Sequence, residues 1–374
     1  MRFVSACVVV LALAVITSSA AYAQSAGIPV PNDKKAWEAL AYYYADEEMK
    51  PELDAYLDAT EQAYPNGQYA ALVSLYRGIS SAVRWRPQEA APYLQQTIER
   101  FPGTREAQMS LYWQGYSLCY RMSPTSGGFA EAMPIFDQVI GTYPDSEAAC
   151  WASLRLANIH GRTSGQAALD EYRELTERCP GSQPAARAQS YLAGALAKMG
   201  RNTDAAAEYQ RLIDEWTGIA RSVEIAKAHD AIAKIAEQGG DYAEAIRRRQ
   251  KILNNFCETR TSYDAYYWLT QAYRRANNLP QAIADLEADI PQCCGVRCLA
   301  GLLVLQRLYL DVGNTAKAQE VRAAIQQYPS TSQAHTTQDL SYGVMMVAEQ
   351  MRVTNPAEYA RIMEDRSLLY TRPR

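Results

Sequence analysis

The sequence predicts an all-α chain whose helical hairpins stack into a solenoid, and two observations favour this fold class. An aromatic or apolar residue followed by Pro or a small residue recurs every 34 to 42 residues. No run of alternating apolar and polar residues is long enough to suggest a sheet. A period in this range is typical of one helical hairpin per repeat. The recurring pairs are Tyr64-Pro65, Phe101-Pro102, Tyr143-Pro144, Cys179-Pro180, Trp216-Thr217, Phe256-Cys257, Ile290-Pro291 and Tyr328-Pro329.

Each recurring pair closes a segment whose apolar residues follow helical spacing. Such spacing predicts second helices over 129–142, 203–215 and 242–255. A Gly or Asn turn precedes each of them, and these residues accept the left-handed conformation that ends a helix. The segments before the turns, 186–199, 225–238, 262–276 and 299–312, are the expected first helices.

Composition describes a globular chain and excludes several classes of function. The 374 residues carry 37 Lys and Arg against 41 Asp and Glu, a net charge of −4. Without a concentrated basic block, binding to nucleic acid is not expected. His160, His229 and His335 are the only histidines and lie in different repeats. No nucleophile elbow, zinc-protease motif or phosphate-binding Gly loop is present, so we expect neither an enzyme nor a cofactor.

Residues 1–23 have the pattern of a secretory signal peptide. Arg2 supplies the positive charge, Phe3 to Ile16 form a mostly apolar run, and Ala21-Tyr22-Ala23 fits a cleavage site. The expected mature chain starts at Gln24, with a periplasmic or secreted location. An uncleaved anchor is the alternative. No later segment has the roughly 18 apolar residues of a membrane span, so the mature chain is expected to lack one.

The repeat pattern resembles the tetratricopeptide repeat family. The unit that carries the resemblance places small residues where the two helices approach, and it consists of Tyr191, Leu192, Ala193, Leu196, Gly200, Ala205, Tyr209 and Leu212. The resemblance implies a right-handed α-solenoid of about seven to eight hairpins over residues 33–331. Residues 24–32 would be a linker. Residues 332–374 leave the period and are expected to form C-terminal capping helices and a tail.

Within that family, the Pro-x-Ser/Thr endings and the segment from Leu111 to Tyr116 resemble exported bacterial envelope proteins. These include the Tol–Pal coordinator and the lipoprotein subunit of the outer-membrane barrel assembly machine. The chain departs from both, because no Cys follows the cleavage site to carry a lipid and no N-terminal coiled coil is visible. The resemblance implies a binding role in the envelope without naming a partner.

Tyrosines and charged residues on the first helices are the candidates for binding. The chain has 26 Tyr and only 5 Phe, and Tyr suits wet recognition surfaces. The resemblance implies that first helices line a concave groove. The groove register then contains Tyr112, Tyr116, Cys119, Lys227, Asp230, Lys234, Glu237, Tyr267, Gln271, Arg274 and Arg307. Packing between repeats is the alternative role for each Tyr, and Arg247 to Arg249 are expected on a solvated outer face.

Seven cysteines remain after the signal peptide. Cys150 and Cys179 lie at helix ends that meet in an antiparallel hairpin, which makes a disulfide between them plausible. Cys257, Cys293, Cys294 and Cys298 fall at inter-repeat turns, where a second disulfide is expected. A metal site is not expected there, because vicinal cysteines lack the usual ligand spacing. Cys119 is expected to be a buried free thiol.

The sequence therefore predicts an exported, non-enzymatic scaffold that binds proteins or peptides in its groove, with a role in envelope assembly or maintenance. The alternative is a carbohydrate- or peptidoglycan-binding solenoid that stacks sugars on its tyrosines. An extended peptide, a carboxylate terminus and a glycan strand all stay open as ligands.

Overall fold

The computed structural model describes residues 31–36, 50–64, 67–83, 86–120, 128–162, 165–256, 260–292 and 297–327. Over these residues the chain is helical, and the only strand-like feature there is an isolated bridge between Thr217 and Ala220. The chain divides into two compact units, Met1–His160 and Gly161–Arg374. The prediction of an all-α chain of helical hairpins is confirmed for the described residues.

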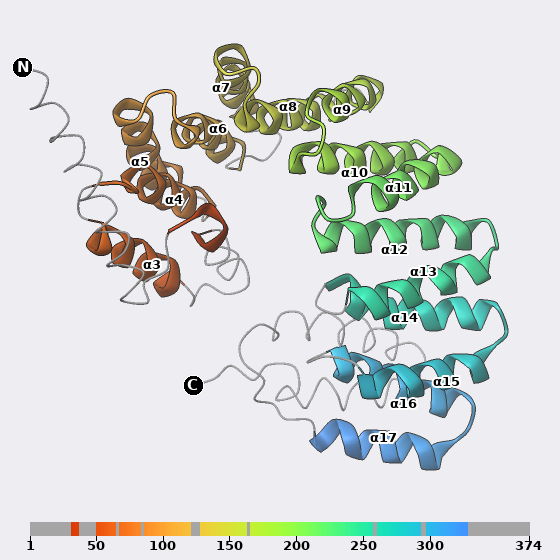
Figure 1. Ribbon diagram of the computed structural model, residues 1–374. Helices are drawn as coiled ribbons and strands as arrows, with labels where there is room; N and C mark the ends of the chain where they lie inside the picture. The colour runs from red at the N-terminus through yellow and green to blue at the C-terminus, as the bar shows by residue number, and fades with distance from the viewer. Residues whose placement is uncertain are drawn as a thin grey trace, which may run out of the picture. The chain divides into compact units, whose positions relative to one another are not determined.

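The first unit contains six of the labelled helices (Figure 1). The hairpins α4–α5 and α6–α7 pack side by side, and α8 packs on both α6 and α7. The first helices α4, α6 and α8 also contact one another in sequence. The bounds are α3 Lys50–Ala63, α4 Ala70–Val83, α5 Pro87–Arg100, α6 Arg105–Tyr120, α7 Gly128–Thr142 and α8 Glu147–His160.

The second unit repeats the same arrangement over α9 to α17, one hairpin layered on the next (Figure 1). Each first helix contacts its own second helix and the first helix of the next hairpin, as α10, α12, α14 and α16 do. The bounds are α9 Gly165–Arg178, α10 Gln183–Lys198, α11 Asn202–Trp216, α12 Ser222–Gln238, α13 Tyr242–Asn255, α14 Arg260–Arg275, α15 Leu279–Asp289, η2 Ile290–Gln292, α16 Arg297–Asp311 and α17 Thr315–Gln327.

The turn inside each hairpin of the second unit is the same, and it explains the predicted Gly and Asn positions. Gly200, Gly240, Asn277 and Gly313 have positive φ angles of 75°, 81°, 54° and 76°. The next residue's N–H then donates to a carbonyl five residues back, as from Asp241 to Ala236 at 2.8 Å. This bond satisfies a carbonyl that the helix end would leave unpaired.

The Pro-x-Ser/Thr endings between hairpins are helix caps. The side-chain oxygens of Thr104, Ser146 and Ser182 accept from the backbone N–H three residues on, at 3.2, 3.0 and 3.3 Å. Each cap satisfies one of the free N–H groups at the start of α6, α8 and α10. The repeating sequence pattern therefore arises because each hairpin needs a helix cap and a left-handed turn.

Small residues let the two helices of a hairpin approach closely. A Cβ added at Gly78 would lie 2.5 Å from Leu94 Cδ2, and one added at Gly115 would lie 2.8 Å from Phe136 Cε1. Leu94 and Phe136 are both fully buried. These two glycine contacts agree with the prediction that small residues lie where the helices of a hairpin approach closely, here in α4–α5 and α6–α7.

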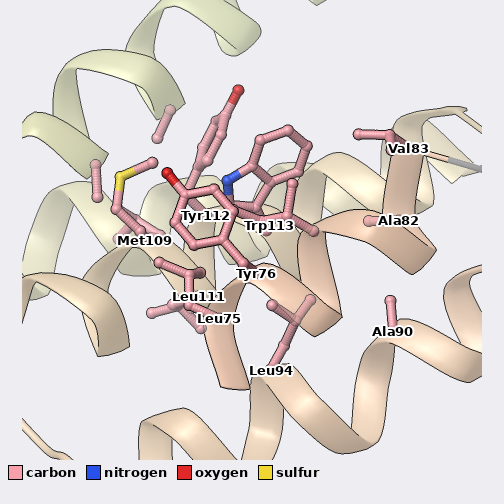
Figure 2. Close-up of a cluster of buried hydrophobic side chains, with 14 of the residues drawn as sticks. Leu75, Tyr76, Ala82, Val83, Ala90, Leu94, Met109, Leu111, Tyr112 and Trp113 are labelled. Carbon is pink, nitrogen blue, oxygen red and sulfur yellow. The ribbon is translucent and has the colours of Figure 1, made fainter. Parts of the chain in front are cut away.

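Aromatic side chains join Leu, Val, Ile and Ala in the core of the first unit. Tyr76, Tyr112 and Trp113 lie together with Leu75 and Leu94 between α4, α5 and α6 (Figure 2). Tyr112 is 3% exposed, and its ring lies 5.9 Å from the ring of Phe136. Tyr112 therefore packs in the core, and its expected place on an open groove is wrong.

The cysteines are only partly covered by the described residues. Cys150 and Cys179 are each in a disulfide bond, and their pairing with one another stays the prediction from the sequence. Cys119 is free but half-buried rather than buried, and burial raises the pKa of its thiol to about 11. Cys257, Cys293 and Cys294 lie outside the described residues, as does the side chain of Cys298.

Several predicted segments also lie outside the described residues. These are the signal peptide at 1–23, most of the 24–32 linker and the whole of the 332–374 cap. Among the helices that the structure does describe, none combines the length and the apolar character needed to span a membrane.

His229 is a buried histidine at the junction of α11, α12 and α13. It is 4% exposed, and its Nδ1 lies 3.4 Å from Nη1 of Arg248. Burial, with the positive charges of Arg248 and Lys251, lowers the pKa of His229 from 6.5 to about 4, against the opposing effect of Asp214. Arg248 in turn donates to Glu244 and Gln210. The folded protein therefore favours the neutral form of the His229 imidazole.

We predict that Gly115→Ala destabilises the first unit while Gly141→Ala does not. The new methyl group at 115 would overlap the Phe136 ring, so the net loss should be about 1–2 kcal/mol despite a better helix propensity. Nothing lies within 4 Å of a Cβ at Gly141, and that variant should be unchanged or slightly more stable. Urea denaturation of both variants measures the difference. Equal stabilities would contradict the close packing.

We predict that His229 makes the second unit less stable in acid. The unfolded histidine binds its proton near pH 6.5 and the folded one only near pH 4, so stability falls as the pH drops through that window. The loss should approach about 3 kcal/mol. His229→Gln removes this titration and has a precedent in Gln189, which holds the matching position of α10 and donates to Glu208. Thermal denaturation at pH 7 and pH 4 compares the two proteins; the same loss in both would rule His229 out.

Candidate binding face on the first helices of the second unit

The predicted binding residues of the second unit come from one register of three consecutive first helices. Lys227, Asp230 and Lys234 lie on α12, while Tyr267, Gln271 and Arg274 lie on α14, and Arg307 lies on α16. Since α14 contacts both α12 and α16, these residues belong to one continuous surface. We call this surface the first-helix face. Lys227 and Lys234 are exposed, whereas Asp230, Tyr267, Gln271, Arg274 and Arg307 are partly buried.

Glu237 of α12 is shared by two arginines. Nη1 and Nη2 of Arg249 donate to its two carboxylate oxygens at 2.6 and 3.2 Å. Arg275 of α14 lies 3.6 Å from the same carboxylate. A paired, fork-like contact of this kind holds the carboxylate in one orientation.

Asp230 of α12 is also shared by two cations. Lys234 Nζ lies 2.6 Å from one of its oxygens, one helical turn further along the helix. Nε of Arg249 lies 3.8 Å from the other oxygen. Asp230 is thus paired from its own helix and from α13.

Asp311, at the end of α16, is the third shared carboxylate. Arg307 Nε lies 2.8 Å from one of its oxygens, and Arg274 of α14 forms an ion pair with the other. Two guanidinium groups from neighbouring hairpins therefore meet on one aspartate. One carboxylate balances only one of the two positive charges.

The exposed charge of the first-helix face is positive because the cations reach solvent and the carboxylates do not. The side chains of Lys234 and Arg275 are 52% and 51% exposed, and that of Arg274 is 34% exposed. The side chains of Asp230, Glu237 and Asp311 are 17%, 6% and 12% exposed. An approaching partner would therefore meet ammonium and guanidinium groups first.

Two titration shifts describe the same surface. Burial, together with the positive charge of Arg307, lowers the pKa of Arg274. Burial raises the pKa of Tyr267, against the opposing effect of Arg274 and Arg275. Nε of Arg274 is also buried without a hydrogen-bond acceptor among the described residues. A further anion between Arg274 and Arg307 would be electrostatically favoured.

The predicted residues of the first unit form a packing cluster instead. The hydroxyl of the buried Tyr112 accepts from Nε of Arg155 at 3.2 Å. The guanidinium of Arg155 lies 4.4 Å from the centre of the Tyr116 ring, a cation–π contact between α6 and α8. These tyrosines therefore pack between helices, which was the alternative role considered for them. Tyr116 is partly buried and sits at the edge of the cluster.

Sequence reasoning missed two members of the first-helix face and the buried arginine that pairs with its acids from α13. Arg275 and Asp311 carried usable signals, since Arg275 follows Arg274 and Asp311 lies four residues after Arg307, the spacing of a helical ion pair. Arg249 carried none. It was expected on a solvated outer face with Arg247 and Arg248, yet it is fully buried and Arg248 is largely covered. Only Arg247, at 64% exposure, lies in solvent as expected.

Potential metal-ligating side chains do not gather in the described part of the chain. No group of three or more His, Cys, Asp or Glu side chains there is arranged to hold a metal ion. His229 is enclosed between helices, and His335 lies outside the described residues. On the first-helix face, Asp230, Glu237 and Asp311 are all engaged in ion pairs.

Comparisons with known proteins point to the same repeat. Two models of the tetratricopeptide repeat match residues 109–146 and 162–218. A tetratricopeptide repeat protein from Parabacteroides merdae is 12% identical, with 73% of this chain and 98% of that chain covered and a TM-score of 0.38. Yeast Tom70 is 12% identical, with 90% and 68% covered and a TM-score of 0.46. No curated protein matches the sequence.

The matched segments fall on α6–α7 and on α9–α11, where the caps, left-handed turns and small-to-large contacts were found. These matches do not support the narrower resemblance to exported envelope proteins. The family models and the stacked helical hairpins thus support the tetratricopeptide repeat family, and the fold is an all-α, tetratricopeptide-like solenoid.

Proposed function

We propose that this protein is an exported, non-enzymatic scaffold that binds protein partners through the first-helix face of its second unit. The tetratricopeptide repeats support the broader part of this proposal, an interaction scaffold. The observation that carries the finer part is the sharing of Asp230, Glu237 and Asp311, each between two cations. This sharing leaves excess positive charge on the exposed side.

The partner chemistry follows from that charge. An extended segment bearing several carboxylates would complement Lys234, Arg274 and Arg275, which are the more exposed groups. The chain as a whole carries a net charge of −4, so a positive surface on it is a local feature. Local complementarity of this kind steers encounter and selects partners by charge.

Tyr267 and Gln271 add neutral contacts beside the cations. Tyr267 is partly buried, and its ring lies 4.9 Å from that of Trp268 in an edge-to-face arrangement. A tyrosine held in this way offers a fixed apolar surface and a hydroxyl group. Tyr267 would therefore contact the backbone or an apolar side chain of the bound segment.

The location and process complete the proposal. The N-terminal pattern supports export to the periplasm or beyond, and the repeat endings support a role in envelope assembly or maintenance. A carbohydrate- or peptidoglycan-binding role through Tyr267 is the competing proposal. It predicts that neutral glycans bind and that the arginines matter little.

We predict that the chain from Gln24 binds a capped, fluorescein-labelled hexaglutamate peptide, and that Arg274→Gln with Arg307→Gln weakens binding by roughly tenfold or more. Capping both peptide ends excludes recognition of a terminal carboxylate. Fluorescence anisotropy at two salt concentrations measures affinity, which should fall as salt rises.

The matched control for this experiment is Arg173→Gln with Arg211→Gln. These arginines lie on the second helices α9 and α11, are 42% and 50% exposed, and pair with Asp170 and Glu215. Their loss changes the total charge as much as the loss of Arg274 and Arg307 but leaves the first-helix face intact. Equal weakening by this control, or no binding by the parent chain, would count against the proposal. Retention on a neutral glycan array that is lost with Tyr267→Ala would favour the carbohydrate role.

We predict separately that the full chain, expressed in a bacterium with a working secretion system, is recovered outside the cytoplasm beginning at Gln24. Intact mass and N-terminal sequencing of the recovered protein test this directly. Recovery from the cytoplasm with residues 1–23 still attached would remove export from the proposal and leave the binding face unaffected.

A further inference from the structure

Arg249 lies on a second helix, α13, yet its guanidinium group pairs with two acids of the first-helix face. Its side chain is 0% exposed, and it spans from α13 to the carboxylates of Glu237 and Asp230 on α12. The guanidinium also lies 6.0 Å from the centre of the Trp268 ring of α14. A fully buried arginine is costly unless its charge is paired, which ties the positions of these carboxylates to it.

The ion pairs of Arg249 affect which charged groups are exposed on the first-helix face. Glu237 and Asp230 are drawn inward to 6% and 17% exposure, while their other partners, Arg275 and Lys234, stay about half exposed. Without Arg249, the described ion pairs would leave Arg275 as the partner of Glu237 and Lys234 as the partner of Asp230. Each acid would then neutralise an exposed cation.

We propose that Arg249 is a positioning residue that masks the acids of the first-helix face and thereby makes it selective for acidic partners. This inference rests on the proposed function. Arg249 touches no partner itself. It acts by neutralising Glu237 and Asp230 from beneath the surface, so that Arg275 and Lys234, although paired with these acids, keep net positive charge for carboxylates from outside.

The neighbouring Arg247 provides the matched comparison. It lies on the same helix and carries the same charge, but it is 64% exposed and pairs with Glu244. Replacing Arg247 by Met changes the total charge of the protein as much as replacing Arg249 does. A difference between the two variants therefore reports on position.

The test measures the affinity of capped hexaglutamate for the chain from Gln24 and for three variants. Arg249→Met should weaken binding by roughly tenfold, and Arg247→Met should leave it nearly unchanged. Adding Glu237→Gln to Arg249→Met removes the unmasked acid and should restore most of the affinity. Far-UV circular dichroism and thermal denaturation confirm which variants are folded.

Three results would overturn the inference. They are unchanged binding by a folded Arg249→Met variant, equal weakening by Arg247→Met, and no recovery in the double variant. Recovery of affinity counts only where thermal denaturation shows that Arg249→Met is folded at the assay temperature, because Glu237→Gln would also repair a purely structural defect by removing an unpaired buried carboxylate. Failure of the parent chain to bind hexaglutamate would instead contradict the proposed function.

A second measurement on the unaltered chain covers the case in which Arg249→Met does not fold. Carbodiimide labelling with an amine, followed by peptide mass spectrometry, reports how accessible each carboxylate is. Glu237 should be labelled far less than Glu215, whose side chain is 55% exposed on α11. Similar labelling of Glu237 and Glu215 would show that no acid is masked, whether or not a peptide binds.

Discussion

The close approach of the two helices in each hairpin is the constraint on which the rest of the structure depends. At Gly78 and Gly115 there is no room for a Cβ, because Leu94 and Phe136 occupy that space. In the second unit, left-handed turns at Gly200 and Gly240 join the two helices of a hairpin within a few residues. Packing then buries one side of each hairpin against the next.

Because of this constraint, one face of each first helix both contacts the neighbouring hairpin and contributes to the protein surface. In the first unit that face is filled by Tyr112, Tyr116 and Arg155, whose rings and guanidinium group pack on one another. In the second unit it carries acids shared between cations. The same repeat thus yields a packed aromatic cluster in one place and a charged surface in another.

The difference in burial between acids and bases makes the exposed charge of the first-helix face positive. A count of the charged residues on α12 and α14 mixes acids and bases and predicts no clear preference. The structure separates them by depth, with Glu237 and Asp311 largely covered and Lys234 and Arg275 largely open. A partner responds to the exposed groups, since water and salt screen them only in part and the buried pairs are already satisfied.

From sequence alone, the helix bounds to within three residues, the turn positions and the buried register of residues such as Leu192, Ala205 and Leu212 followed correctly. The reason is that caps, left-handed turns and helical spacing act over a few residues. The burial of Arg249 and Tyr112 and the meeting of Arg274 with Asp311 were decided only by the tertiary structure. Those contacts join residues 12 to 43 positions apart, and their depth depends on how neighbouring helices pack. Local sequence carries no record of that depth.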